Sequence, residues 1–438
     1  MGPEVIFYSL GMLIVLVLMG VHIGIALGVT SAVGVYLIFD NFDIAMSILG
    51  STAYEAVRSH ALAVIPLFVL MGELVSRSGA ATSLYTLCDR AMGRLPGRLA
   101  AATVVGNTAF AAVSGVAIAS AATFSRIAYP EMKRQGYANS YALGVITGSA
   151  CLGMLIPPSV LLIIWAILTE GSVGALFIGG VVPGILLGII FIAYCVLAAM
   201  RNPEIAPGTA PGDKLEKQDQ DVSVQRGGLG VLGLIIVVLG GIWGGIFTPT
   251  EAAGFGVLGS AVIGWLNGMR YRAFMDAIYD AGRSTAPIMF LLITGSMYAR
   301  LLALSGGINM IQDLFTDAGL SIFAMMLIMT LVWLLLGALI DSISVILMTV
   351  PIFFPIAMAA GLDEIAFAIY GILIIEAGLL TPPVGLLVFT VKAAVPDPSV
   401  TLGEIFRGSV PYWIMMLAVA VLILLVPEIA SWLPGKMF

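Results

Sequence analysis

An aspartate lies where an apolar chain accommodates charge least easily. Asp341 is the only charged residue in the 40-residue stretch 321–360. A carboxylate at membrane depth is costly, and residues of this kind mark ion or substrate pathways. Asp341 therefore either coordinates a cation or, together with Ser342, caps a helix that begins beside it.

Proline pairs interrupt two other long apolar stretches. Proline lacks an N–H donor and frees the carbonyl one turn earlier, so two in succession unwind a helix. The freed carbonyls and nearby hydroxyls are hard oxygen ligands, which suit a small cation. The pairs and their stretches are Pro157-Pro158 in 138–169, followed by Ser159, and Pro382-Pro383 in 365–395, preceded by Thr381.

The elements that must position these residues are membrane helices. Of 438 residues, 60% are hydrophobic and 10% are charged, and the mean hydropathy is +1.09. Ordinary globular chains are about a quarter charged, so a soluble enzyme and a disordered protein are excluded. The 19 basic and 25 acidic residues form no basic patch for nucleic acid. The composition predicts an all-α polytopic membrane protein.

Apolar runs of about 20 residues mark the expected spans. Residues 201–226 form a polar segment rich in Pro, Gly and charge, which is typical of a solvated linker. Segments 43–60 and 271–284 are amphipathic, and we expect them at the membrane interface. The expected spans are 5–21, 23–39, 61–76, 174–199, 229–247, 252–267, 286–303 and 409–433, with longer stretches at 100–130, 138–169, 321–360 and 365–395.

The two parts flanking the linker resemble each other. The sequence GMLIPPSVLLIIWAIL at 153–168 matches GLLTPPVGLLVFTVKA at 378–393, and the offset is 225 residues. The same offset relates Pro130 to Pro355 and Gly136 to Gly361. These landmarks predict an internal repeat of residues 1–200 and 227–438, joined by the linker 201–226.

Loop charges orient the two repeats. Segments 77–98 and 131–140 of the first repeat are basic, whereas the matching segments 305–320 and 361–365 contain only acidic charges. Because cytoplasmic loops carry excess Lys and Arg, the first pair faces the cytoplasm and the second faces the periplasm. The repeats are therefore inverted, with five crossings each. The linker is cytoplasmic and both termini are periplasmic.

The same charges make two stretches re-entrant. Stretch 100–130 has basic residues at both ends, and stretch 321–360 has acidic residues at both ends, so each enters and leaves on one side. We expect two hairpins of short helices, turning near 112–115 and 337–342. Together with the broken helices 138–169 and 365–395, they give four non-helical places at membrane depth, which must line a cavity or bind a ligand.

Paired broken helices in two repeats are typical of a transporter binding site. Ser114 and Ser159 either bind a ligand or serve as local caps. Asn107 either belongs to the site or makes an interhelical hydrogen bond. Arg126 either snorkels to the interface or binds substrate. Glu376, within an apolar run, either pairs with an arginine or binds a ligand.

The chain also resembles a known family, the large membrane subunit of tripartite ATP-independent periplasmic (TRAP) transporters. The strongest matching segment is GGIWGGIFTPTEAA at 240–253. Four others follow the family's order across nearly the whole chain. They are IPLFVLMGEL at 65–74, YPEMKRQGY at 129–137, GMLIPPS at 153–159 and EAGLLTPPVGL at 376–386.

This resemblance implies an elevator-type, sodium-coupled importer in the bacterial inner membrane, with scaffold and transport domains. A periplasmic binding protein would deliver an organic acid, and a small four-helix membrane subunit would extend the scaffold. The resemblance implies two Na⁺ sites. They are Ser114, Gly115, Pro157, Pro158 and Ser159 for one ion, and Asp341, Thr381, Pro382, Pro383, Val384 and Gly385 for the other. The candidate substrate ligands, taken from the residues themselves, are Ser114, Ser159, Asp341 and Asn107.

Other function classes fit the sequence less well. A membrane serine protease needs a His at membrane depth, and neither His22 nor His60 lies mid-span, so we expect no enzyme. A proton-coupled or exchange-type organic anion transporter of the same architecture is the alternative. In that case the titration of Asp341 or Glu376 would matter.

Overall fold

The chain is helical wherever the structure describes it, as the composition predicts. The computed structural model describes residues 4–58, 60–207, 222–317 and 321–437, and these contain no β-strand. The first half contains α1 (Val5–Leu18), α2 (Ile23–Phe39), α3 (Phe42–Arg58), the 3-10 helix η1 (His60–Ala63), α4 (Val64–Arg77), α5 (Ala80–Met92), α6 (Arg98–Ser114), α7 (Ala117–Arg134), α8 (Asn139–Ala150), the 3-10 helix η2 (Cys151–Met154), α9 (Val160–Leu168) and α10 (Val173–Arg201).

The second half is helical to its end. It contains α11 (Val222–Trp243), α12 (Pro249–Leu266), α13 (Tyr271–Ser305), α14 (Gly307–Asp317), α15 (Ile322–Leu339), α16 (Ser342–Ala359), α17 (Glu364–Gly378), α18 (Leu386–Ala394), α19 (Leu402–Leu425), α20 (Glu428–Ser431) and α21 (Pro434–Met437).

Several helices have the length and apolar composition of membrane spans. Within the described residues these are α10, α13, α15, α16 and α19. Helices α4 and α5 bend by 73° at their junction and count as one more if they form a single span. The shorter helices α1 and α2 are also strongly apolar. Helices of this length and composition are those of a multi-pass membrane protein.

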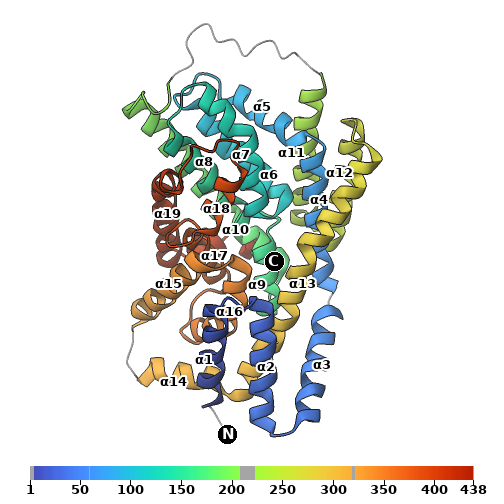
Figure 1. Cartoon of the computed structure of the whole chain (residues 1–438), viewed down its shortest axis with the longest axis vertical. Helices are drawn as coiled ribbons and strands as arrows, with labels where there is room; N and C mark the ends of the chain where they lie inside the picture. Colours follow the sequence, from blue (N-terminus) through green and yellow to red (C-terminus); the bar gives the residue numbers. More distant parts are fainter. Residues whose placement is uncertain (1–3, 59, 208–221, 318–320, 438) are drawn as a thin grey trace.

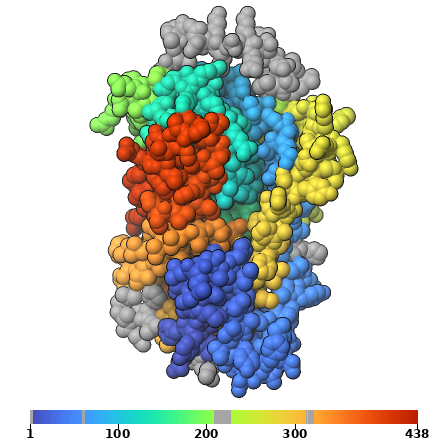
Figure 2. Space-filling view, viewed as in Figure 1, coloured from blue at the N-terminus to red at the C-terminus, as the bar shows by residue number. Residues whose placement is uncertain are grey.

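Helices from both halves mix in two packing groups (Figure 1). In one group, α2 and α4 pack on α13, and α4 and α5 pack on α12 and α11. In the other, α8 packs on α19, α7 on α18 and α9 on α16. Figure 2 shows the red segment of the second half directly against the teal segment of the first half. The fold therefore interleaves the halves and does not place them side by side as separate domains.

Two helix pairs turn back on themselves within a few residues. Helices α6 and α7 pack together and are joined by Gly115-Val116, and α15 and α16 are joined by Ile340-Asp341. Both turns fall in or beside the regions expected from the sequence. The side of the membrane on which each pair opens, and the two-fold relation between the halves, stay predictions.

Helix α13 corrects one expectation. Segment 271–284 does not end before a separate span at 286–303, because α13 runs through both for 35 residues. Its polar first part packs against α4, where Arg77 pairs with Asp280 and lies 3.9 Å from Asp276. This pairing offsets the cost of charge within a long helix. Pro287 lies inside the helix, where it removes one backbone hydrogen bond.

Three expected loops also differ in extent. Residues 222–226 of the predicted linker 201–226 belong to α11, and 208–221 lie outside the described residues. The predicted loops 77–98 and 305–320 contain α5 and α14. Amphipathic sequences of this length form helices once a neighbouring surface covers their apolar face.

The sequence Thr-Pro-Thr-Glu at 248–251 forms the start of helix α12. Thr248 is the N-cap of α12, Pro249 is its first residue and Glu251 its third. The Thr248 N–H donates to Glu251 Oε2 at 2.8 Å, and the Glu251 N–H donates to Thr248 Oγ1 at 3.3 Å. This reciprocal capping box satisfies two N–H groups that a helix start leaves free, and it explains the Thr-Pro-Thr-Glu pattern.

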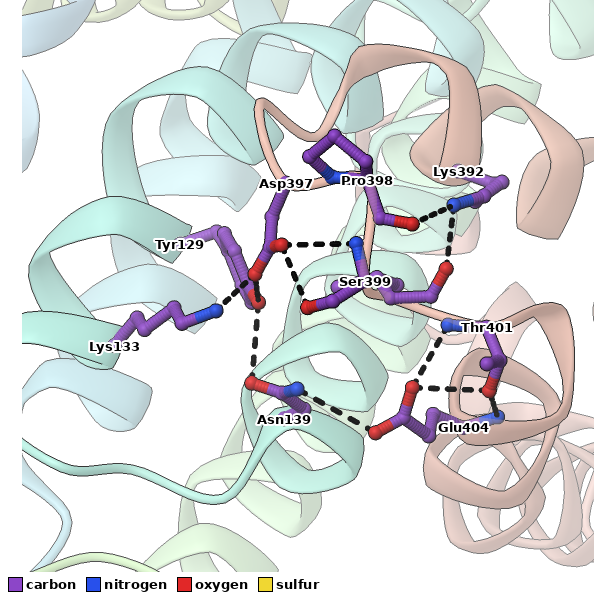
Figure 3. Close-up of polar contacts among 10 residues, drawn as sticks. Tyr129, Lys133, Asn139, Lys392, Asp397, Pro398, Ser399, Thr401 and Glu404 are labelled. Atoms are coloured by element: carbon purple, nitrogen blue, oxygen red, sulfur yellow. Dashed lines mark hydrogen bonds and ion pairs between the residues drawn. The ribbon is translucent and has the colours of Figure 1, made fainter.

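A polar cluster ties the end of α7 to the loop between α18 and α19 (Figure 3). Asp397 in this loop pairs with Lys133 and accepts a hydrogen bond from the Tyr129 hydroxyl at 2.9 Å. Ser399 donates to Asp397 from its N–H at 3.0 Å and from its hydroxyl at 2.7 Å. Lys133 and these donors hold the pKa of Asp397 well below its usual range. The cluster joins the two halves through two carboxylates, because Glu404 also accepts a hydrogen bond from the Asn139 amide at 3.4 Å.

Asp397→Asn should lower the melting temperature of the purified protein at neutral pH, because the neutral amide loses the pairing with Lys133. The carboxylate has a lower pKa in the folded than in the unfolded state. Its stabilisation is therefore complete above the unfolded pKa of about 3.9 and declines as pH falls below it. The difference between wild type and variant should narrow below about pH 4.

Thermal unfolding across a pH series measures this difference. Glu204→Gln is the control, because Glu204 is an exposed carboxylate just after α10. Equal melting temperatures for wild type and Asp397→Asn at neutral pH would contradict the role given to the cluster.

Candidate ion and substrate site

The first hairpin turns against the first broken helix. Gly115 closes the turn with φ +65°, and its carbonyl accepts a hydrogen bond from the Val160 N–H at 3.4 Å. A Cβ at Gly115 would lie 3.1 Å from the Pro158 carbonyl oxygen. The tip of one element therefore packs on the backbone break of the other, as a site formed by both requires.

Ser159 spans the first break. Its hydroxyl donates to the Met154 carbonyl at 2.7 Å and accepts from the Leu162 N–H at 3.3 Å, so it is the N-cap of α9. Pro157 and Pro158 beside it are buried. Ser159 was expected either to bind a ligand or to cap a helix locally. These hydrogen bonds show that it caps α9.

The second hairpin turns at Asp341, which is the N-cap of α16. Its two carboxylate oxygens accept from the Ser344 N–H at 3.0 Å and from the Ser344 hydroxyl at 2.5 Å. The capping partner is therefore Ser344. Ser342, expected in that role, instead donates its hydroxyl to Glu376. A cap uses only part of a carboxylate's acceptor capacity, so capping and cation binding remain compatible.

The second hairpin also meets the second break. The Ala338 carbonyl accepts from the N–H groups of Val384 and Gly385 at 3.2 and 3.1 Å. The Thr381 hydroxyl donates to the Gly378 carbonyl at 2.8 Å. A Cβ on Gly378 would lie 2.8 Å from the Cα of Gly337, so the two backbones touch. Unlike the first break, this one leaves its two prolines, Pro382 and Pro383, exposed.

A cavity of about 80 Å³ lies between the two hairpin tips. Both tips and both broken helices contribute to its lining, and its polar side chains are Asp341, Ser342 and Glu376. The lining residues are Gly115, Val116, Ala117, Ile118, Met154, Val160, Leu161, Ile288, Asp341, Ser342, Ile343, Glu376, Leu379 and Leu386. The two hairpin turns therefore meet at this cavity, and residues that flank the proline breaks complete its lining.

A second cavity, the vestibule, lies between α4 and the first hairpin. It measures about 220 Å³ and contains Glu73, Ser76, Ser114, Thr123 and Ser284 among its lining residues. The Ser114 side chain is buried, with 4% of the residue exposed, and its hydroxyl has no partner among the described residues. Ser114 therefore faces the vestibule and is absent from the lining of the cavity between the tips.

Glycine allows α4 to approach the hairpin closely. A Cβ on Gly72 would lie 2.6 Å from the Cα of Ser114. Any side chain larger than hydrogen would push the hairpin tip away from α4. The contact joins the two packing groups of helices at the edge of the vestibule.

Asn107 lies outside both cavities. It is fully buried, and its amide donates to the Ile146 carbonyl at 3.1 Å and to the Ser149 hydroxyl at 2.8 Å. Its side-chain oxygen accepts from Ser120. Asn107 therefore makes the interhelical hydrogen bonds that were one of its two expected roles. Its place outside both cavities does not support the other role, substrate binding.

Arg126 and Glu376 complete the residues singled out from the sequence. Arg126 is exposed on α7, one turn beyond Thr123 of the vestibule. Glu376 is buried on α17 and lines the cavity between the tips. The only sequence signal for Glu376 is that it is an isolated carboxylate in an apolar run. Its hydrogen-bond partner, the Ser342 hydroxyl, lies 34 residues away in the sequence and could not be predicted from it.

The chain matches a transporter family along almost its whole length. Residues 10–429 match the family described as Tripartite ATP-independent periplasmic transporter, DctM component. The chain therefore belongs to this family of TRAP transporter large permeases. It is a transport subunit and not an enzyme.

Individual relatives agree with this assignment. The chain is 33% identical over 386 residues to the C4-dicarboxylate TRAP transporter large permease protein DctM of Pseudomonas aeruginosa, which covers 87% of this chain and 88% of that protein. It is 29% identical to the ectoine TRAP transporter large permease protein TeaC of Halomonas elongata, with 97% of each chain covered. It is 28% identical to the sialic acid TRAP transporter large permease protein SiaM of Vibrio cholerae, covering 85% of this chain and 86% of that protein.

A solved structure has a similar fold. The crystal structure of the Alcanivorax borkumensis YdaH transporter superposes with a TM-score of 0.59 at 15% identity, covering 90% of this chain and 89% of that one. At this identity the similarity concerns the fold alone. It supports the helical transporter architecture described above.

Gly115→Ala should destabilise the protein measurably. A left-handed conformation costs a non-glycine residue about 1–2 kcal/mol, and the new methyl group would press on the Pro158 carbonyl. Gly188→Ala within α10 is the matched control, because a Cβ there meets nothing within 4 Å. Alanine in a helix interior is favoured over glycine by roughly 0.5–1 kcal/mol. Thermal unfolding of the two purified variants should separate them, and equal stability would show that the tip tolerates a side chain.

Proposed function

We propose that this permease imports a small organic acid across the bacterial inner membrane, driven by Na⁺ and working by an elevator mechanism. A periplasmic binding protein delivers the substrate, and a small four-helix membrane subunit extends the scaffold. The observation that carries this proposal is the cavity where two hairpin tips meet two broken helices. Irregular backbone at membrane depth is tolerated where it binds or transports a ligand.

Sodium is proposed because the converging groups are hard oxygen donors. Within the described lining of the cavity, the ionisable side chains are the carboxylates Asp341 and Glu376. The first proposed Na⁺ site uses Ser114, Gly115 and the backbone of 157–159. The second uses Asp341 with the backbone and hydroxyl of 381–385. Carbonyl, hydroxyl and carboxylate oxygens are the ligands that such cations take.

The organic acid is proposed from the relatives. C4-dicarboxylates, ectoine and sialic acid, named for three of them, are all organic acids. Half-helices such as α9, α16 and α18 begin at the breaks and the second hairpin tip. Their N-terminal N–H groups and dipoles favour a negatively charged group. The ligand of the binding protein encoded beside this subunit would identify the acid that is transported.

The elevator mechanism is supported by the two packing groups. One contains the hairpins and broken helices, and the other contains α2, α4, α5, α11, α12 and α13, of which α5 also packs on α6 of the first hairpin. The close contact of Gly72 with Ser114 lies between them. We assign the first group to the moving domain and the second to the scaffold. A glycine at this boundary leaves little side-chain interlocking to oppose sliding.

Asp341→Asn should weaken Na⁺ activation of transport strongly. Asparagine caps a helix about as well as aspartate, so the change removes charge and keeps the cap on α16. Each lost 1.4 kcal/mol of attraction lowers apparent affinity about tenfold. Ser114→Ala and Thr381→Ala each remove one neutral hydroxyl and should cost less.

Uptake across a Na⁺ series at fixed pH, with membrane expression matched, measures all three variants. An unchanged Na⁺ dependence in Asp341→Asn would reduce the carboxylate to a helix cap. Uptake by the wild type that follows a pH gradient and ignores Na⁺ would instead favour the proton-coupled or exchange-type alternative.

Reconstituted transport should require the periplasmic binding protein even at saturating substrate. The only long polar segment of the chain is the linker 201–226, which is too short to form a substrate-capture domain. Liposomes containing the two membrane subunits, with and without the binding protein, provide the measurement. Robust uptake by this chain alone would contradict the tripartite arrangement.

A further inference from the structure

Glu376 is a buried carboxylate to which the two Na⁺ sites proposed above give no role. It lies on α17, two residues before the end of the helix at Gly378, and 1% of its surface is exposed. Its Oε1 accepts a hydrogen bond from the Ser342 hydroxyl at 2.6 Å. Its Oε2 has no partner among the described residues. One oxygen is thus satisfied by the second hairpin tip, and the other is free.

The free oxygen belongs to a side chain that lines the cavity between the tips. That cavity, about 80 Å³, also receives Asp341, and none of the described residues lining it is Lys, Arg or His. A single water needs only about 10–15 Å³ of such space, so there is room for a small ion with a water. Two residues with carboxylates thus line one partly open cavity whose described lining contains no protein cation.

An ionised Glu376 has a high electrostatic cost at this place. A buried charge without a full set of partners is strongly unfavourable. Asp341 is stabilised in part by the Ser344 N–H and hydroxyl, whereas Glu376 has one neutral donor. A cation in the cavity would offset the charge of Glu376, and it would give Glu376 Oε2 the partner that the described residues do not supply.

We propose that Glu376 is a direct ligand of a cation held in this cavity. Given the proposed sodium coupling, on which this inference rests, the cation is Na⁺. Because Ser342 donates to the other oxygen of the same carboxylate, ion binding and the position of the second hairpin tip are linked. Hydrogen bonds to an ionised acceptor are stronger than neutral ones, so a cation that keeps Glu376 ionised also holds Ser342 in place.

The first half offers no equivalent carboxylate. Cys151 stands 225 residues before Glu376, the offset that relates the two proline pairs, and its thiol donates to the Glu376 carbonyl at 3.9 Å. A thiol is a weak ligand for a hard cation. The charge at this level of the fold therefore comes from the second half alone.

The test uses the purified full-length chain in detergent and the melting temperature across a NaCl series. Choline chloride keeps the ionic strength constant. Na⁺ should stabilise the wild type, and Glu376→Gln should raise the half-maximal Na⁺ concentration by about tenfold or more, because a neutral amide replaces a charged ligand. Glu428→Gln, at an exposed carboxylate on α20, should match the wild type.

The outcomes separate this inference from the proposed function. A wild-type Na⁺ response that Glu376→Gln retains unchanged would overturn the inference alone, since a glutamine mimics a carboxyl that is protonated and binds no cation. No Na⁺ response in wild type or Glu428→Gln would overturn sodium coupling itself. If Glu376→Gln does not fold, Glu376→Asp provides the test, because it keeps the charge and moves the carboxylate oxygens away from the cavity. A ligand role for Glu376 predicts a higher half-maximal Na⁺ concentration in this variant. An unchanged half-maximal Na⁺ concentration would contradict that role.

Discussion

Every backbone N–H and carbonyl group at membrane depth must find a partner within the protein, since lipid offers none. This constraint explains why the interruptions of the helices come in facing pairs. Gly115 at one tip accepts from Val160 after the first break, and Ala338 beside the other tip accepts from Val384 and Gly385. Each irregular segment supplies what the other lacks. Small residues make this possible, because Gly337 and Gly378 let two backbones touch.

The same pairing explains where charge is tolerated. Asp341 lies at a helix start, where N–H groups are free, and Glu376 lies within reach of a hydroxyl on the neighbouring tip. Where α4 packs on α13, Arg77 offsets the aspartates of α13. At the end of α7, Lys133 and Asp397 connect the two halves (Figure 3). Charged groups thus occur where an interruption or an opposite charge lowers their cost.

Features encoded by neighbouring residues were predictable from the sequence. The proline pairs predicted the breaks, and the like-charged flanks of 100–130 and 321–360 predicted two turns. Contacts between distant residues were not predictable. The partner of Arg77 lies 203 residues away, so the polar start of α13 was interpreted as a separate interfacial segment. Asn107 likewise looked equally suited to a site, because its partners on α8 lie about 40 positions further along the chain.

The two proline breaks resemble each other in sequence but not in environment. Pro157 and Pro158 are enclosed, whereas Pro382 and Pro383 are at the surface. Sequence likeness therefore does not carry over into equal surroundings. Protein encloses the first break on all sides, whereas the prolines of the second break remain accessible from outside the chain.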